Sequence, residues 1–321
     1  TLLTENGAVI DSRETRTGIR TVRVSPDKRL LLNGQPVTIG VTDRRQEYPY
    51  IGYALSDDAS YRDAFKIREA GFNAVRSLYC PPSPAFLDAC DELGLMVIDA
   101  VPGWHPGRDS LSAGAAVHEV QMLCRRDRNH PSVVIWETSL READMPVGLL
   151  SALHQTVKEE LPFGNNITSC RTDTICDLFM PDTGPTGIMD IFRLPKKAPQ
   201  TVTTPGRPVA LRLTADLSNK PLRADGADVI FIYAALTDST GNLVFTADSL
   251  VEFTVRGSAE LTGTNPVRAR EGIATILLRA DNQGRIMIKA SSEGMSEAEL
   301  MTETRETGKP QKAKAPLQNL K

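Results

Sequence analysis

From about residue 37 to residue 180 the chain alternates strand-like and helix-like segments, and this order constrains the fold more than any other feature. Strands are expected at 37–41, 74–79, 95–101, 133–140, 167–170 and 176–180, and helices at 57–70, 84–93, 115–126 and 146–160. Such alternation is typical of parallel strands joined by crossover helices. The run 95–101 is apolar, as expected of a strand buried on both faces. We therefore predict an α/β domain.

One of these strands leads directly to a carboxylate. The stretch from Arg125 to Glu142 reads as a charged helix end, a stop at Pro131, a buried strand and then Glu142. In a β/α barrel the catalytic residues lie at the C-terminal ends of the strands, where the loops form a shared mouth. Glu142 is therefore a candidate catalytic residue, with a solvated loop carboxylate as the alternative. Glu137, on the strand itself, is predicted to be structural.

The number of strands falls short of a complete barrel. A closed barrel needs eight strands and roughly 250 residues. Residues 37–198 supply about six strands, with a further one near Gly187 and Ile188. The α/β part is therefore predicted to be a (β/α)8 TIM-type barrel that is incomplete. An open barrel leaves an edge strand exposed, which favours association into a homo-oligomer.

After a Thr/Pro/Gly linker at 201–207 the pattern becomes all-β. Alternating segments are expected to form strands at 209–215, 227–237, 250–256, 273–280 and 284–291. Short strands at this spacing predict an immunoglobulin-like β-sandwich. Earlier in the chain, Asn33-Gly34 between two apolar triplets predicts a hairpin.

The predicted organisation has four parts. Residues 1–24 are expected to end a preceding β-sandwich domain, 25–200 to form the truncated barrel, 201–303 the immunoglobulin-like sandwich, and 304–321 a disordered tail rich in Lys, Pro and Gln.

Composition argues against several classes of partner. The net charge is −3, so no global field attracts nucleic acid or a membrane surface. No apolar run approaches the ~20 residues that span a bilayer. No signal peptide is recognisable, and periplasmic, secreted and cytoplasmic locations all stay open.

The cysteines and histidines give no sign of a metal or cofactor site. The cysteines are odd in number and form no CxxC pair, so reduced thiols are expected in place of a disulfide or zinc site; they are Cys80, Cys90, Cys124, Cys170 and Cys176. The four histidines lack metal-ligand spacing. His130, in Asn-His-Pro, is expected to be a structural turn residue.

Several segments together resemble glycoside hydrolase family 2, the β-galactosidase and β-glucuronidase family. The stretch Arg125–Glu142 is similar to the family strand that reads roughly NHPSVxxW and leads to an Asn-Glu pair. Further similarity covers the entry hairpin and first strand, the second strand, the third barrel unit, the barrel end and an appended immunoglobulin-like domain, at 29–41, 69–76, 86–99, 187–196 and 207–302.

The resemblance implies a retaining β-glycosidase that acts on carbohydrates with terminal β-galactoside-type bonds. Such an enzyme uses a general acid/base with a raised pKa and a nucleophile ~5–5.5 Å away. Glu142 matches the acid/base. The substrate-binding residues implied are Arg45, Arg76, Tyr79, Asp99, Trp104 and Arg141. Trp104 is expected either to stack on a sugar or to lie in the core or rim.

Three of these positions depart from the family pattern. Tyr79 and Arg45 stand where histidines are usual, and Arg141 replaces the Asn before the acid/base. That Asn normally bonds the sugar 2-hydroxyl. An adjacent guanidinium also tends to lower the pKa of Glu142, which opposes its action as an acid at neutral pH.

The nucleophile motif of the family is missing. Only five residues separate Pro181 from Gly187, where a Glu-Tyr-Gly-like strand end is expected. Asp177 and Asp182 are the nearest carboxylates, and neither matches, so the nucleophile stays unknown. Two functions therefore stay open. One is a glycoside hydrolase that is active or impaired, and the other is a catalytically inactive remnant that binds glycans or serves a structural role.

The sandwich itself raises a third hypothesis, that of a carbohydrate-binding module. Its strands carry few aromatic residues, namely Phe231, Tyr233, Phe245 and Phe253, and alternation is expected to bury most of them. A scaffold role is the favoured interpretation.

Overall fold

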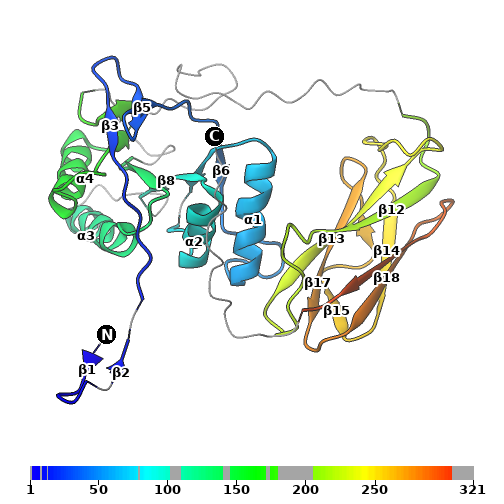
Figure 1. Cartoon of the computed structure of the whole chain (residues 1–321). Coiled ribbons are helices and arrows are strands. Elements are labelled where there is room, and N and C mark those ends of the chain that lie inside the picture. Colours follow the sequence, from blue (N-terminus) through cyan, green and yellow to red (C-terminus); the bar gives the residue numbers. More distant parts are fainter. Residues whose placement is uncertain are drawn as a thin grey trace. The chain divides into compact units, whose positions relative to one another are not determined.

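In the computed structural model the chain forms two compact units (Figure 1). The first unit consists of Thr1–Glu47 and Asp63–Gln200, and the second of Tyr48–Arg62 and Thr201–Lys321. The residues that the structure describes are 2–7, 9–12, 14–78, 80–101, 110–139, 145–170, 174–179 and 205–305. The predicted barrel strand near Gly187, the barrel end and the tail from 306 onward lie outside them.

A six-stranded sheet forms the centre of the first unit, and every neighbouring pair in it is parallel. Its strands, in chain order, are β6 (Val41–Arg44), β7 (Ala74–Ser77), β8 (Met96–Ala100), β9 (Val133–Glu137), β10 (Thr168–Cys170) and β11 (Leu178–Phe179). Spatial order follows chain order, so each crossover leads to the adjacent strand. Six consecutive parallel strands confirm the incomplete TIM-type barrel.

Four helices connect these strands: α1 (Asp57–Glu69), α2 (Pro84–Leu93), α3 (Ser110–Asp127) and α4 (Val147–Glu160). Local chemistry fixes the bounds of α2. The Ser83 hydroxyl accepts a hydrogen bond from the Phe86 amide at 3.2 Å, and Pro84 takes the first helical position. Gly94 ends the helix at φ +67°, a conformation that favours glycine. Helices α3 and α4 lie side by side (Figure 1).

A small antiparallel sheet precedes the parallel one and shares its core. It consists of β3 (Val22–Val24), β4 (Leu30–Leu32) and β5 (Gln35–Pro36), and the predicted Asn33-Gly34 hairpin joins the last two. Both turn residues have positive φ, as a tight hairpin turn requires. Apolar side chains of β3 and β4 pack with the parallel strands in one cluster. Residues 22–24 therefore pair with residues 30–32 within the first unit.

The remaining strands of the first unit are β1 (Leu2–Leu3) and β2 (Val9–Asp11), which pair with each other in a two-stranded antiparallel sheet.

Two four-stranded antiparallel sheets make up the predicted β-sandwich in the second unit (Figure 1). Its strands are β12 (Ala210–Ala215), β13 (Val229–Thr237), β14 (Leu250–Arg256), β15 (Ala259–Thr262), β16 (Val267–Arg268), β17 (Ile273–Ala280), β18 (Arg285–Ser291) and β19 (Ala298–Glu303). One sheet has the order β12-β13-β17-β15 and the other β16-β14-β18-β19. Alternate residues of both sheets face inward and form one apolar core.

One expectation about the cysteines is wrong. Cys170 and Cys176 form a disulfide across the connection from β10 to β11. Cys170 ends β10 and Cys176 lies two residues before β11, with 5.9 Å between their Cα atoms. A spacing of six positions does not by itself reveal this approach. Cys80, Cys90 and Cys124 are free, and burial raises the pKa of the Cys124 thiol to about 12.

Among the described residues, no helix is long and apolar enough to cross a bilayer.

Candidate functional site

The candidate site lies at the C-terminal ends of the parallel strands, and the strand register decides which side chains share its face. Arg76 pairs with Asp43 on one side and with Ile98 on the other. Two residues further along β8, Ala100 pairs with Glu137 of β9. Paired residues of parallel strands project to the same side, and side chains alternate along each strand. Asp43, Arg76 and Glu137 therefore share one face of the sheet.

Arg76 and Glu137 form a buried two-point ion pair on this face. The Nε and Nη2 groups of Arg76 donate to the two carboxylate oxygens of Glu137. Both side chains are at least 95% buried, so the attraction between them is stronger than at a surface. The third member, Asp43, has a carboxylate oxygen 3.8 Å from Nη1 of Arg76 and is partly exposed. The guanidinium thus holds two carboxylates at the strand ends.

Four of the predicted site residues lie outside the described residues: Tyr79, Trp104, Arg141 and Glu142. Their roles stay predictions. Glu142 follows Glu137, the last residue of β9, by five positions in the sequence.

Two consecutive arginines at the end of β6 lie in different settings: Arg44 is the last residue of the strand and Arg45 the first after it. Arg44 is buried; it donates to Asp63 with its Nε and Nη2 groups at 3.1 and 2.8 Å, and it lies over the ring of Phe86 at 3.9 Å. Its role is to bind α1 and α2 to the sheet. Arg45, the predicted substrate-binding residue, is exposed directly after the strand end.

Asp99 lies on the opposite face of the sheet from Arg76. It pairs with Trp136 of β9, and Glu137, the next residue of β9, projects to the other face. The side chain is 1% exposed, and neither of its oxygens accepts a hydrogen bond from an N–H or O–H donor of the described residues. Burial, followed by the neighbouring Asp127 carboxyl of α3, raises the pKa of Asp99 well above its usual range. The structure therefore separates Asp99 from the other candidate residues.

Replacing Asp99 by asparagine is expected to stabilise the chain at neutral pH by about 1–3 kcal/mol, because the amide cannot ionise in this buried position and each unit by which folding raises a carboxyl pKa costs about 1.4 kcal/mol at a pH above both values. A raised folded-state pKa means that Asp99 contributes full stability below its unfolded pKa, about 3.9, and loses it as the pH rises through the folded value. The gain from Asp99→Asn should therefore shrink toward pH 4. Urea unfolding between pH 4 and 8 measures it, with Asp248→Asn, an exposed position, as the matched control. Equal stability of wild type and Asp99→Asn throughout that range would contradict this account.

A cluster of acidic groups and a histidine lies at the other end of β9. Asp88, Asp91 and His130 bring one ligand atom each within 4.8 Å of the others. Asp91 is already engaged, since it contacts Nδ1 of His130 at 2.7 Å and accepts from the Ser132 amide at 2.9 Å. The hydrogen bond to Asp91 raises the pKa of His130. These contacts brace the Asn-His-Pro turn that starts the strand, in agreement with the structural role expected of His130.

Two family models match the chain. The model described as the TIM barrel domain of glycosyl hydrolases family 2 matches residues 22–143, and the one described as glycoside hydrolase family 2 C-terminal domain 5 matches residues 211–301. The first covers the hairpin and the strands that carry Asp43, Arg76 and Glu137, and the second covers most of the sandwich. The chain belongs to glycoside hydrolase family 2.

Curated relatives of similar sequence are β-galactosidases. A β-galactosidase of Thermoanaerobacter pseudethanolicus is 36% identical over 143 residues, which is 44% of this chain and 19% of that protein. A β-galactosidase of Vibrio cholerae is 29% identical over 192 residues, or 56% of this chain and 18% of that one. The matched part is thus about one-fifth of the length of these curated relatives.

Solved structures of glycosidases share the fold. A β-glycosidase from Bacteroides vulgatus superposes with a TM-score of 0.70 at 15% identity and covers 90% of this chain and 67% of that one. A β-glucuronidase from glycoside hydrolase family 2 also superposes with a TM-score of 0.70, at 16% identity. The superposition covers 94% of this chain and 52% of the β-glucuronidase chain.

Sequence reasoning did not anticipate the partnership of Glu137 with Arg76. Glu137 was predicted to be structural, and its place as the counter-ion of a predicted substrate-binding arginine was missed. A usable signal was present, because the strand 133–137 is apolar except for its last residue. A lone charge at the C-terminal end of a buried parallel strand points to a partner on a neighbouring strand end.

Proposed function

We propose that this family 2 chain supplies the acid/base side of a retaining β-glycosidase site that acts on terminal β-galactoside-type O-glycosidic bonds. The observation that carries the proposal is the buried Arg76–Glu137 pair, which fixes the end of β9 at the barrel mouth five residues before Glu142. The family match and the β-galactosidase relatives support the substrate class.

In this proposal each group has a distinct task. Glu142 protonates the glycosidic oxygen and later removes a proton from the attacking water, as the acid/base of a retaining enzyme does. The residues proposed to contact the substrate are Arg45, Tyr79, Trp104 and Arg141. Arg76 orients the carboxylates at the strand ends. Asp99 acts from the far face of the sheet, so its influence on a sugar is indirect.

The second carboxylate of the double displacement is unassigned. On the site face of the described strand ends, the carboxylates are Asp43 and Glu137, and both lie at Arg76. This arrangement favours one alternative function, that of a catalytically inactive family member that binds glycans or serves a structural role.

Turnover of a nitrophenyl β-galactoside and β-glucuronide panel separates the two functions. Replacing Glu142 by glutamine keeps its size and removes its proton transfer, so we expect at least a 10²–10⁴-fold loss of turnover, the usual contribution of a general acid/base. Glu160→Gln on α4, whose partner Arg125 is a surface residue, serves as the matched control and should retain wild-type turnover. Absence of turnover from a wild-type chain of confirmed 35.0 kDa mass would favour the inactive alternative.

A further inference from the structure

The outer face of β13 carries an aromatic pair that resembles a sugar-binding platform. Phe231 and Tyr233 are two positions apart on one side of the strand, and their rings stack with centroids 5.8 Å apart. Aromatic rings on an open sheet face would suit a glycan. In the second unit this face is covered instead by Tyr48, whose ring centroid lies 4.8 Å from that of Phe231.

Tyr48 belongs to a segment, Tyr48–Arg62, that packs on the sandwich through an apolar cluster of its own. The buried members of this cluster are Tyr48 and Ala59 from the segment and Val229 and Leu277 from β13 and β17. The half-buried members are Ile51, Leu55 and Phe231. The cluster is separate from the core between the two sheets, so the sandwich has a second apolar surface that these residues fill.

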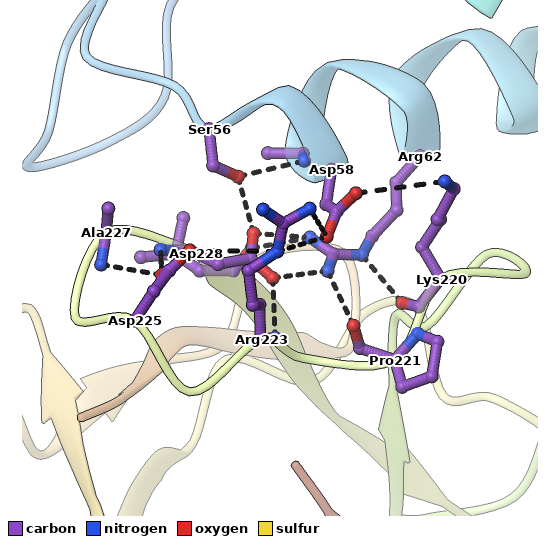
Figure 2. Close-up of polar contacts among 11 residues, drawn as sticks. Ser56, Asp58, Arg62, Lys220, Pro221, Arg223, Asp225, Ala227 and Asp228 are labelled. Atoms are coloured by element: carbon purple, nitrogen blue, oxygen red, sulfur yellow. Dashed lines mark hydrogen bonds and ion pairs between the residues drawn. The ribbon is translucent and has the colours of Figure 1, made fainter. Parts of the chain in front are cut away.

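At the end of the segment, Arg62 places its guanidinium among groups of the loop before β13 (Figure 2). Its Nε donates to the Lys220 carbonyl at 3.0 Å, and its Nη groups donate to the carbonyls of Pro221 and Val229 and to both carboxylate oxygens of Asp228. All five N–H donors of the guanidinium are thereby used. The Arg62 residue is 1% exposed.

The carboxylate of Asp228 likewise accepts several hydrogen bonds. Besides two donors of Arg62, its carboxylate accepts the Ser56 hydroxyl proton and the Arg223 amide, the latter at 2.9 Å. Ser56 also caps α1, because its oxygen accepts from the Ala59 amide at 3.0 Å. One fully buried carboxylate thus joins the start of α1, Arg62 and the β13 loop (Figure 2).

A ring of weaker ion pairs surrounds this centre. Asp58 lies 2.7 Å from Arg223 and 3.8 Å from Lys220, and Arg223 lies 3.7 Å from Asp225. The basic side chains here are about one-third exposed, and such pairs contribute little individually. The specificity of the contact therefore resides in Arg62, Asp228 and the Tyr48 ring.

We propose that the sandwich is a clamp for this segment: its aromatic outer face is a binding surface for residues 48–62 of the same chain, with Arg62 and Asp228 as the positioning pair. The segment follows β6 directly along the chain, after Arg45, Gln46 and Glu47. The saturated donors and acceptors select an arginine and a carboxylate at these positions, since a lysine offers three donors at one point and cannot reproduce the planar fork. Because Tyr48 already covers the Phe231 ring, the partner of this face is protein and not glycan.

Amide hydrogen exchange of the full chain tests the proposal. In Asp228→Asn the clamp loses its buried charge, and we expect amides within residues 48–62 to exchange at least ten-fold faster while amides of β14 and β18 keep wild-type rates. Asp248→Asn, an exposed aspartate of the same unit paired with Arg268, is the matched control and should leave both regions unchanged.

Tyr48→Ala keeps the test decisive if Asp228→Asn prevents the sandwich from folding. It removes only the ring over Phe231 and leaves no buried charge unpaired, so faster exchange confined to residues 48–62 is expected again. Wild-type protection of residues 48–62 in Tyr48→Ala would overturn the proposal, as would loss of protection spread evenly over the whole sandwich.

Discussion

Replacing Glu137 by alanine is expected to lower the free energy of unfolding of the first unit by about 3–5 kcal/mol, the cost of removing one partner of a buried ion pair. Arg76 would keep its charge in a position that is 4% exposed. Urea unfolding followed by the fluorescence of Trp136 measures the loss, because this buried indole is adjacent to Glu137 on β9.

Two further variants distinguish the effect of a buried ion pair from that of an exposed ion pair. Glu92→Ala breaks the exposed Arg16–Glu92 pair, and its effect should stay within about 1 kcal/mol. Replacing both partners, as in Arg76→Met with Glu137→Leu, removes both charges and should restore most of the stability. A Glu137→Ala loss no larger than that of Glu92→Ala would show that the pair does not hold the strand ends together.

Replacing Phe253 by alanine is expected to destabilise the sandwich by about 3–5 kcal/mol, through lost apolar burial and the cavity that remains. Phe253 lies on β14, is 1% exposed and is one of the largest side chains in the core between the sheets. Both tryptophans of the chain precede residue 201, so calorimetry is the suitable measurement for the second unit.

Phe245→Ala is the matched control for this prediction, because Phe245 belongs to the same unit and is 54% exposed. Its effect is expected to stay within about 0.5 kcal/mol of wild type. Equal shifts for the two phenylalanines would contradict the assignment of Phe253 to the core.

The sequence predicted the elements whose ends have a local chemical cause. Helix α2 was predicted to the residue, because Ser83 and Pro84 start it and Gly94 stops it. Strands β14 and β17 were predicted equally well, since their alternation is strong and turns flank them. Strands β15, β16 and β19 were missed. β15 pairs with β17 and β16 with β14, each past an intervening strand, whereas β19 pairs with β18, its neighbour in the chain.

In the candidate site, too, features set by neighbouring residues were predictable, and features set by residues far away in the sequence were not. The family resemblance implied that Arg76 lies near the end of the second strand, and in the structure Arg76 is the residue before the last of β7. The face of Asp99 was not predictable, because it follows from the pairing of Arg76 with Ile98, and the sequence does not reveal which residues of two parallel strands pair. The disulfide and the docking of residues 48–62 were missed for a related reason, since both are determined by where the chain returns.

The discontinuous second unit has a consequence for synthesis of the chain. Arg62 and Asp228 are 166 positions apart, so at ~5–20 residues per second the ribosome adds the carboxylate roughly 10–30 s after the arginine. During that interval Tyr48, Ile51 and Leu55 have no sheet to cover them, although the strands of the first unit are already being made. Nascent chains that stop before Asp228 should therefore display this apolar segment to chaperones and proteases, whereas the finished chain conceals it.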